Sequence, residues 1–241
     1  MMASRPFAVF DIDGTLIRWQ LYHALADELG ESGKLDPEKF AEVKRARTAW
    51  KKRKGSSTFD AYEQLLVDLI GRAITGIKVE DFKLACDKVM EEYKDQVYTY
   101  TRDLIRDLKG QGYLLFTISA SQDIIVGMLA DYYGFDDWGG SVYEIADGHF
   151  TGEKVVLRGK RKTTLLKELV TRHKATWKGS IGVGDSEGDI PMLEAVEKPI
   201  AFNPNELLFK HAVQQGWKVV VERKNMVYEL EPGSGKYTLH K

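Results

Sequence analysis

The sequence of 241 residues has one cysteine and no long apolar run. The single cysteine, Cys86, cannot form a disulfide within the chain, which favours a reducing, cytoplasmic setting. One cysteine and five scattered histidines also exclude the usual zinc frameworks of paired cysteine and histidine ligands. A membrane helix needs roughly 18 to 20 apolar residues. Because runs such as 124–130 are far shorter, we expect no membrane partner.

An excess of charge of one sign is also lacking. Lysine and arginine number 35 and aspartate and glutamate 36, which leaves a formal net charge of -1. This balance removes the electrostatic argument for a dedicated binder of nucleic acid or anionic membranes. The composition, 43% hydrophobic and 29% charged, is instead typical of a globular protein that buries one sizeable core and supports a smaller accessory domain.

Short apolar runs alternate with amphipathic segments along most of the chain, which predicts an α/β fold. An apolar run that ends at a turn, such as residues 7–10, is typical of a strand buried on both faces. We expect strands over residues 7–10, 113–118, 141–145, 180–184 and 217–221, and helices over 101–109, 122–133, 162–173, 191–196 and 206–214. This order predicts a Rossmann-like, mainly parallel sheet with helices on both faces.

One segment interrupts this order. Residues 18–97 are expected to form about four helices and no strand, and they are too many for a crossover connection. We therefore expect an inserted helical cap domain over 18–97 and a core made of residues 1–17 and 98–225. Residues 226–241 form a C-terminal tail that is partly linker-like, because it contains the run Pro-Gly-Ser-Gly.

Polar residues follow three of the predicted core strands at their carboxyl ends. Asp11 and Asp13 follow the first strand, Ser119 follows the second, and Asp185, with Asp189 four residues later, follows the third. Each could be a turn or helix-capping residue when taken alone. The carboxyl ends of parallel strands meet at the edge where such sheets bind ligands. Polar residues at three such strand ends therefore favour a ligand-binding site over three separate turns or caps.

The chemistry of these residues predicts a magnesium and phosphate site. The four carboxylates would repel one another unless a cation neutralised them, and an all-oxygen donor set suits Mg²⁺ better than zinc. Lys160, Arg161 and Lys162 begin the helix before the third strand. A lysine there could neutralise a carboxylate and a phosphoryl group, although most such lysines are solvated.

Two segments resemble motifs of the haloacid dehalogenase superfamily. Residues 11–16, Asp-Ile-Asp-Gly-Thr-Leu, are similar to its first motif, and residues 184–193, Gly-Asp-Ser-Glu-Gly-Asp-Ile-Pro-Met-Leu, resemble its last. The resemblance covers about residues 7–202 and points to the phosphoserine-phosphatase-like subgroup (subfamily IB), whose helical C1-type cap lies between the first and second motifs. It implies Mg²⁺-dependent hydrolysis of a small phosphomonoester.

The resemblance also implies roles for the acidic residues. Asp11 would be the nucleophile that forms an aspartyl-phosphate, and it would also ligate Mg²⁺. Asp13 would protonate the leaving alkoxide, then activate water, and offer its backbone carbonyl to the metal. Asp185 would bind Mg²⁺ directly, and Asp189 would support the metal or its waters.

Other residues are implied to hold the phosphoryl group. Ser119 would bind it together with backbone amides near Gly14, Thr15 and Ala120. For the catalytic lysine, the resemblance favours Lys162, because a glycine three residues before it and a leucine four after it match the spacing of the family. Lys160 remains the alternative.

Residues just beyond the first motif are expected to meet the leaving group. Arg18 and Trp19 would overhang the pocket, or Trp19 would pack in the cap core. Phosphoserine phosphatases typically carry a glutamate nine residues beyond the nucleophile that holds the substrate's ammonium, where this chain has Gln20. This departure weakens an assignment to phosphoserine.

A basic stretch within the predicted cap leaves further alternatives open. Around Trp50 it contains Lys44, Arg45, Arg47, Lys51, Lys52, Arg53 and Lys54. The stretch is either a solvated helix face or a surface that draws an anionic substrate to the crevice. The alternatives to hydrolysis are a phosphotransferase or mutase, or a non-catalytic binder of nucleic acid or protein. The sequence gives no indication of oligomeric state.

Overall fold

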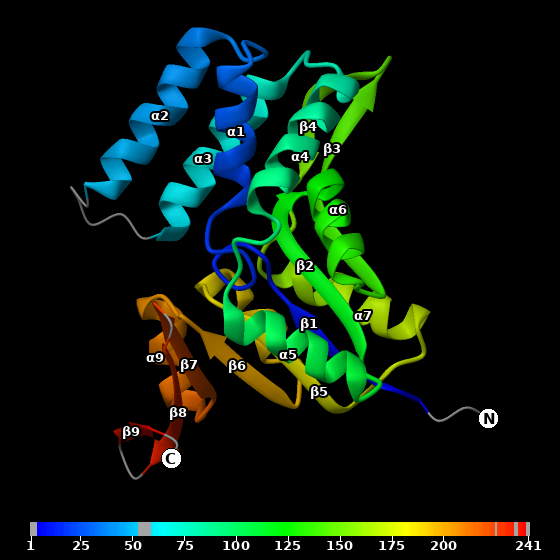
Figure 1. Cartoon of the computed structure of the whole chain (residues 1–241), viewed down its shortest axis with the longest axis vertical. Coiled ribbons are helices and arrows are strands. Elements are labelled where there is room, and N and C mark those ends of the chain that lie inside the picture. The colour runs from blue at the N-terminus through cyan, green and yellow to red at the C-terminus, as the bar shows by residue number, and fades with distance from the viewer. Residues whose placement is uncertain (1–3, 53–58, 225, 234–235, 240–241) are drawn as a thin grey trace.

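The computed structural model describes residues 4–52, 59–224, 226–233 and 236–239, with side-chain burial for 4–52, 65–224 and 226–230. Within these residues, nine strands form one sheet in the order β4-β3-β2-β1-β5-β6-β7-β8-β9 (Figure 1). The strands are β1 (Pro6–Phe10), β2 (Leu114–Gln122), β3 (Asp137–Ala146), β4 (His149–Val155), β5 (Thr176–Gly184), β6 (Lys198–Phe202), β7 (Lys218–Arg223), β8 (Met226–Gly233) and β9 (Lys236–Leu239).

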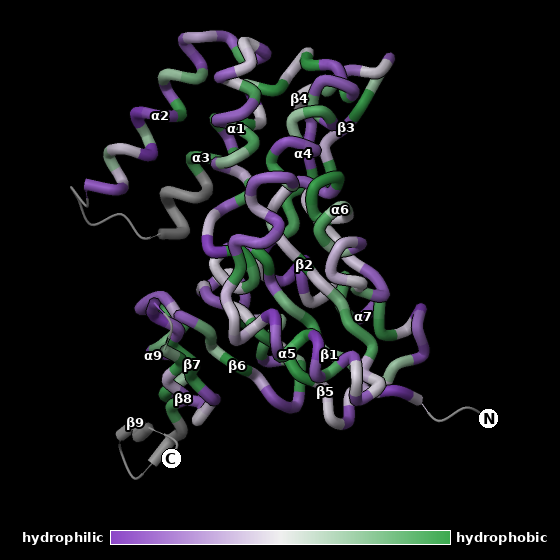
Figure 2. The backbone as a smooth tube through the Cα atoms, viewed as in Figure 1, coloured by the Kyte–Doolittle hydropathy of each residue, from purple (hydrophilic) through white to green (hydrophobic). Residues whose placement is uncertain are grey.

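The middle of the sheet is parallel and buried on both faces. Strands β3, β2, β1, β5, β6 and β7 pair in parallel, while β4, β8 and β9 are antiparallel. Side chains alternate along β1, so that Phe7 and Val9 face one side and Ala8 and Phe10 the other. All four are fully buried, and Figure 2 shows the hydrophobic character of the central strands.

Helices cover the two faces. Helices α5 (Thr99–Gly110) and α6 (Asp123–Tyr133) pack on the side of Phe10, and α7 (Lys160–Arg172) and α8 (Ile190–Leu193) pack on the side of Phe7. Helix α9 (Glu206–Gln215) packs against β6 and β7. The predicted Rossmann-like α/β fold with helices on both faces is thus confirmed.

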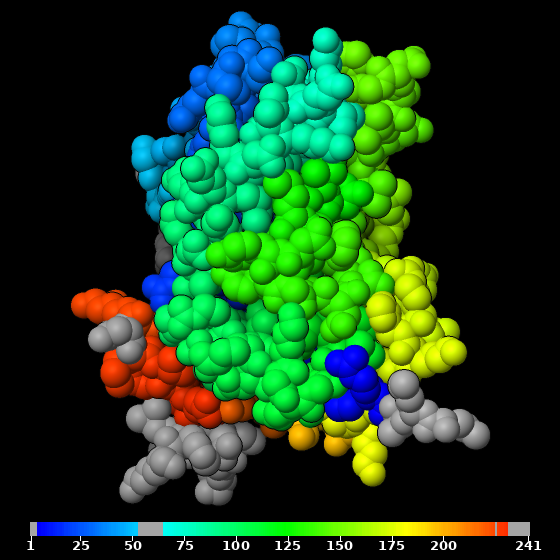
Figure 3. All heavy atoms as spheres, turned by 45° about the vertical axis from the view of Figure 1, so that its right-hand side comes forward, coloured from blue at the N-terminus to red at the C-terminus, as the bar shows by residue number. Residues whose placement is uncertain are grey.

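Of the five helices described between β1 and β2, four stand over one end of the sheet (Figure 1) and form the upper part of the molecule in Figure 3. They are α1 (Leu21–Glu31), α2 (Pro37–Lys51), α3 (Phe59–Ile74) and α4 (Val79–Tyr93). The two connections to the core pair with each other at Ile17 and Val97. The division of the chain at 18–97 remains a prediction, and we call α1–α4 the cap.

Three strands differ from the sequence-based expectation. The linker-like interpretation of residues 226–241 is wrong for β8 and β9, which extend the sheet beyond β7. Strand β4 is not among the expected strands, and it pairs with β3 across a turn at Asp147 and Gly148. In each case the strand exists because a neighbouring strand satisfies its backbone groups, which local composition does not reveal.

No helix in the described part of the chain is long and apolar enough to span a membrane.

Candidate active site

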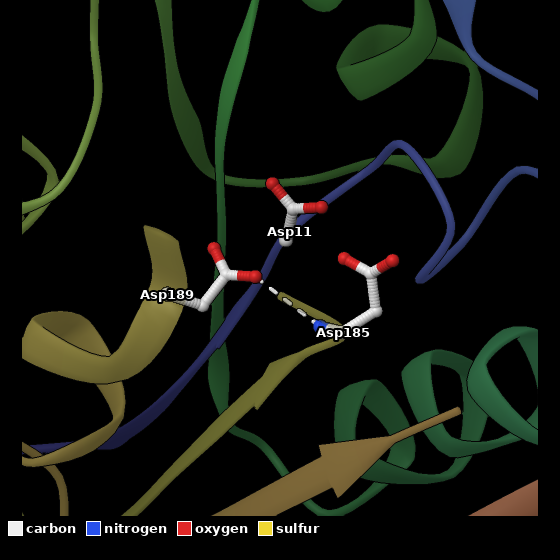
Figure 4. Close-up of side chains that lie close together, drawn as sticks. All are labelled: Asp11, Asp185 and Asp189. Atoms are coloured by element: carbon white, nitrogen blue, oxygen red, sulfur yellow. Dashed lines mark hydrogen bonds between the residues drawn. The ribbon is translucent and has the colours of Figure 1, made fainter. Parts of the chain in front are cut away.

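Three carboxylates meet at the carboxyl ends of β1 and β5. Asp11 directly follows β1, Asp185 directly follows β5, and Asp189 ends the short 3₁₀ turn η1 (Glu187–Asp189). One oxygen from each of the three lies within 4.8 Å of the others, and Figure 4 shows the groups converging from separate elements. Asp11, Asp185 and Asp189 thus lie close together at one edge of the sheet, as expected from their positions after the predicted strands.

A glycine turn allows this approach. Gly14 has a φ of +81°, and a Cβ atom there would lie 2.2 Å from Oδ2 of Asp185. The amide of Gly14 donates to the carbonyl of Ile17 at 3.1 Å, and that of Thr15 donates to Ile12 at 3.2 Å. Two of the three amides expected to hold a phosphoryl group are thus bonded within the turn in this structure, and Thr15 is fully buried.

Lys162 bridges two of the carboxylates. Its Nζ lies 2.6 Å from Oδ1 of Asp11 and 2.6 Å from Oδ1 of Asp189, and only 4% of the residue is exposed. Burial alone would lower the pKa of Lys162, but the two carboxylates outweigh it and raise the pKa above its ordinary value. Lys160, the alternative, is exposed and contacts none of these groups in the structure.

Asp189 is fixed by the loop that carries it. Its Oδ2 accepts hydrogen bonds from the amides of Asp185 (3.2 Å, dashed in Figure 4) and Ser186 (3.1 Å), and from Oγ of Ser186 (3.2 Å). With Lys162 on its other oxygen, this buried carboxylate has donors on both sides. It is therefore oriented before any ligand arrives.

Asp13 lies beside this cluster, and its carboxylate has a different set of partners. Oδ2 accepts from the hydroxyls of Ser119 (2.9 Å) and Ser121 (2.7 Å), and Oδ1 accepts from the amide of Leu21 (2.6 Å). Burial raises the pKa of Asp13, and the three hydrogen bonds lower it only in part. The hydroxyl of Ser119 is thus directed to Asp13, and Gln122, not Ser119, caps α6.

A crevice at this end of the sheet brings the predicted residues together with others. It is lined by Asp11, Asp13, Gln20, Ala120, Arg158, Lys162, Asp185, Ser186 and Gly188. Sequence reasoning missed three of these. Ser186 and Gly188 lie inside the last motif and could have been found from it, whereas Arg158 lies in the connection between β4 and α7 and belongs to no motif.

The comparison with known families matches this geometry. The family described as haloacid dehalogenase-like hydrolase has a model that matches residues 8–194, which include the end of β1, the cap and the loop carrying Asp185 and Asp189. The chain belongs to the haloacid dehalogenase-like hydrolases. The resemblance of the first and last motifs is thus confirmed at the level of the family.

Individual relatives carry phosphatase names. The phosphoserine phosphatase SerB1 of Mycobacterium tuberculosis is 28% identical over 149 residues, 61% of this chain and 48% of that protein. The chain thus spans about half the length of this and two further mycobacterial relatives. The histidinol-phosphatase of Neisseria meningitidis serogroup C is 25% identical over 223 residues, 90% of this chain and 98% of that one.

A solved structure supports the fold. The phospho-aspartyl intermediate analogue of phosphoserine phosphatase superposes with a TM-score of 0.65 at 20% identity, over 92% of this chain and 96% of that one. At this identity the likeness concerns the arrangement of sheet, helices and cap. It shows the fold expected of a haloacid dehalogenase-like hydrolase.

Arg18 does not line the crevice of this hydrolase, so the expectation that it overhangs the pocket is wrong. Its guanidinium donates to the carbonyl of Val97 at 2.9 Å and to the carboxylate of Glu222, and it lies over the ring of Tyr98. The Glu222 side chain is fully buried, and a buried carboxylate needs a charged or hydrogen-bonding partner. That requirement turns Arg18 away from the crevice.

The basic stretch contributes contacts within the cap. Arg47 forms two hydrogen bonds of 2.6 Å to Asp27, and the ammonium of Lys51 lies 4.8 Å from the ring centre of Trp19. Trp19 packs against the core of the cap, as its alternative interpretation predicts. Arg53 and Lys54 lie outside the described residues, and of the others in the stretch none lines the crevice.

Proposed function

We propose that this haloacid dehalogenase-like hydrolase is a Mg²⁺-dependent phosphomonoester hydrolase that acts on a small phosphorylated metabolite. The observation that carries the proposal is the buried bridge of Lys162 between Asp11 and Asp189, with Asp185 and Asp13 alongside. Burial raises the pKa of Asp11, and the lysine in this position opposes that rise and can stabilise charge on a phosphoryl group in transfer. The free thiol of Cys86 agrees with the proposed cytoplasmic setting.

The donor set fits a divalent cation. The three carboxylates carry more negative charge than Lys162 beside them can balance, so an added cation would relieve their mutual repulsion. Carboxylate oxygens are also the ligands that Mg²⁺ prefers. Asp11, Asp185 and the backbone carbonyl of Asp13 would hold the ion, and Asp189 would support it. When bound, Mg²⁺ supplies positive charge that offsets the charge on the phosphoryl oxygens.

In the first proposed step, an oxygen of Asp11 attacks phosphorus and the bond between phosphorus and the ester oxygen breaks. Asp13 gives its proton to the departing alkoxide, so that a neutral alcohol leaves. In the second step, water attacks the aspartyl-phosphate, loses a proton to Asp13 and displaces Asp11. Inorganic phosphate leaves, and both aspartates return to their starting forms.

The test is phosphate release from an aryl phosphate and a panel of phosphomonoesters by wild type, Asp11→Asn and Asp131→Asn, with Mg²⁺ and with EDTA. Asp131 is an exposed aspartate on α6 and serves as the matched control. We expect Mg²⁺-dependent release that falls about 10⁴-fold or more in Asp11→Asn and is retained in Asp131→Asn.

Two results would contradict the proposal. Full release by Asp11→Asn, with the fold confirmed by circular dichroism, would remove Asp11 as the nucleophile. If wild type instead releases the alcohol of the substrate only when a second alcohol is present, and forms a new phosphate ester in place of inorganic phosphate, the reaction is transfer and not hydrolysis.

A further inference from the structure

A second pocket adjoins the crevice, and the mechanism above leaves it without a role. It is lined by Asp13, Gln20, Tyr22, Leu66, Val67, Ala120 and Ser121. We call it the cap-side pocket, because Tyr22 lies on α1, and Leu66 and Val67 lie on α3. It shares Asp13, Gln20 and Ala120 with the crevice. A substrate whose phosphate lies in the crevice can therefore extend into it past Asp13.

The walls of the cap-side pocket suit an uncharged group. Leu66 and Val67 are apolar and almost fully buried, at 1% and 2% exposure. Among the described residues that line the pocket, only Asp13 is acidic, and the proposed mechanism begins with it protonated. Three donors already hold its carboxyl group. An ammonium or carboxylate on a ligand would lose its hydration here without gaining a new counter-charge.

The pocket also presents polar groups that the protein does not use. Tyr22 is 8% exposed, and its buried hydroxyl has no hydrogen-bond partner among the described residues. Buried hydroxyls are nearly always hydrogen-bonded, so a partner from outside the chain is expected. Gln20 precedes the first turn of α1, yet its side chain makes no capping hydrogen bond there. A neutral hydroxyl and a neutral amide thus stand at the pocket.

We propose that the cap-side pocket binds the leaving alcohol of the substrate, and that this alcohol is small, uncharged and carries at least one further hydroxyl group. The inference rests on the proposed hydrolase function and deepens it. The further hydroxyl group bonds to Tyr22 and Gln20, the carbon skeleton packs on Leu66 and Val67, and the ester oxygen lies at Asp13. Polyol phosphates belong to this class, and phosphorylated amino acids do not.

The chain offers a matched control for Tyr22. Tyr143, on β3, also has a buried hydroxyl without a partner among the described residues, and it is 3% exposed. It does not line the cap-side pocket. Tyr22→Phe and Tyr143→Phe therefore remove the same group from similar surroundings, and only the first removes it from the pocket.

The experiment measures kcat/KM for glycerol 1-phosphate, propyl phosphate and phosphoserine in wild type and both variants. We expect wild type to prefer glycerol 1-phosphate to both other esters. The ratio of kcat/KM for glycerol 1-phosphate to that for propyl phosphate falls about tenfold in Tyr22→Phe, as for one neutral hydrogen bond. Tyr143→Phe keeps the wild-type ratio. Gln20→Leu lowers the ratio too and replaces Tyr22→Phe if that variant does not fold.

Two outcomes would overturn the inference while the hydrolase function stands. One is hydrolysis with an unaltered ratio in both Tyr22→Phe and Gln20→Leu, which would mean that water or nothing meets these groups. The other is a wild-type preference for phosphoserine. By contrast, if wild type hydrolyses no ester, not even an aryl phosphate, then the proposed function itself fails.

Discussion

At the scale of single residues, the position of Asp13 depends on hydrogen-bond donors from two parts of the chain. Ser119 and Ser121 reach it from the end of β2, and the amide of Leu21 reaches it from the start of the cap. Ser121 had no predicted role, yet its hydroxyl makes the shorter of the two serine hydrogen bonds. We infer that Ser121 positions the acid that would protonate the leaving group.

Ser121→Ala should therefore affect esters according to their leaving group. We expect kcat/KM to fall about tenfold for alkyl phosphates, the size expected for one neutral hydrogen bond, because Asp13 is protonated when it donates to the leaving group. The fall is smaller for aryl phosphates with acidic phenols, which leave with little protonation. Ser180→Ala removes another fully buried serine hydroxyl, one that accepts from Glu197, and serves as control. Equal losses for both ester types would assign Ser121 a purely structural role.

Which site residues can be predicted from sequence depends on what fixes each side chain. Asp11, Asp185 and Lys162 are predictable, because strand ends and motif spacing place them at one edge of the sheet. Arg18 is not, since its direction is set by Glu222, 204 residues later. Tyr22 is not predictable for a related reason, because the absence of a hydrogen-bond partner for its hydroxyl depends on how α1 packs against the core.

At the scale of elements, the carboxylate of Glu222 on β7 joins both connections between core and cap. It accepts from Arg18 in the outgoing connection and from the amides of Thr99 (3.1 Å) and Tyr100 (2.9 Å) at the start of α5. The side chain of Glu222 is fully buried, whereas 38% of the Arg18 side chain is exposed. Strand β7, through Glu222, thus fixes both connections between the core and the cap.

Glu222→Gln should lower the free energy of unfolding by about 1.5–3 kcal/mol, because it weakens hydrogen bonds to a buried charge. Urea unfolding measures this loss. Glu229→Gln is the control, since Glu229 pairs with Lys218 across β7 and β8 and both side chains are about one-third exposed. That pair should contribute less than about 1 kcal/mol. If the two variants lose the same stability, Glu222 does not hold the cap in the way we describe.

Prediction of elements from the sequence succeeded where an element carries its own signal. The buried run of β1 and the amphipathic pattern of α5 stand out locally. Strands β4, β8 and β9 carry no comparable signal, because they are antiparallel and stabilised by a neighbour. The Pro232-Gly233 pair that suggested a linker lies at the end of β8, beyond the residues that pair with β7, where proline is tolerated.

At the scale of the whole molecule, one buried histidine links the stability of the fold to pH. His23 lies in α1, is 3% exposed and packs edge-on against Trp19. Burial, with the nearby charge of Arg47, lowers the pKa of His23 from 6.5 to about 3. The folded protein therefore keeps this imidazole neutral at pH values where the unfolded chain protonates it.

The sign of the effect follows from that difference. Between pH 6.5 and about 3 the unfolded state binds one more proton at His23, so this residue makes the fold less stable as the pH falls. The contribution approaches about 1.4 kcal/mol for each pH unit below 6.5. His23→Gln has no such proton. We therefore expect the stability of wild type relative to the variant to decline by about 2 kcal/mol between pH 7 and pH 4.8.

Urea unfolding of wild type and His23→Gln at several pH values between 4.8 and 8 measures this decline. The difference between the two proteins at pH 7–8 reports the packing of the imidazole in α1, so each series contains its own reference. Only the change of this stability difference with pH reports the proton that His23 binds in the unfolded state. A difference that stays constant down to pH 4.8 would mean that His23 is protonated in the folded state, and hence that the cap opens to solvent around α1 in acid.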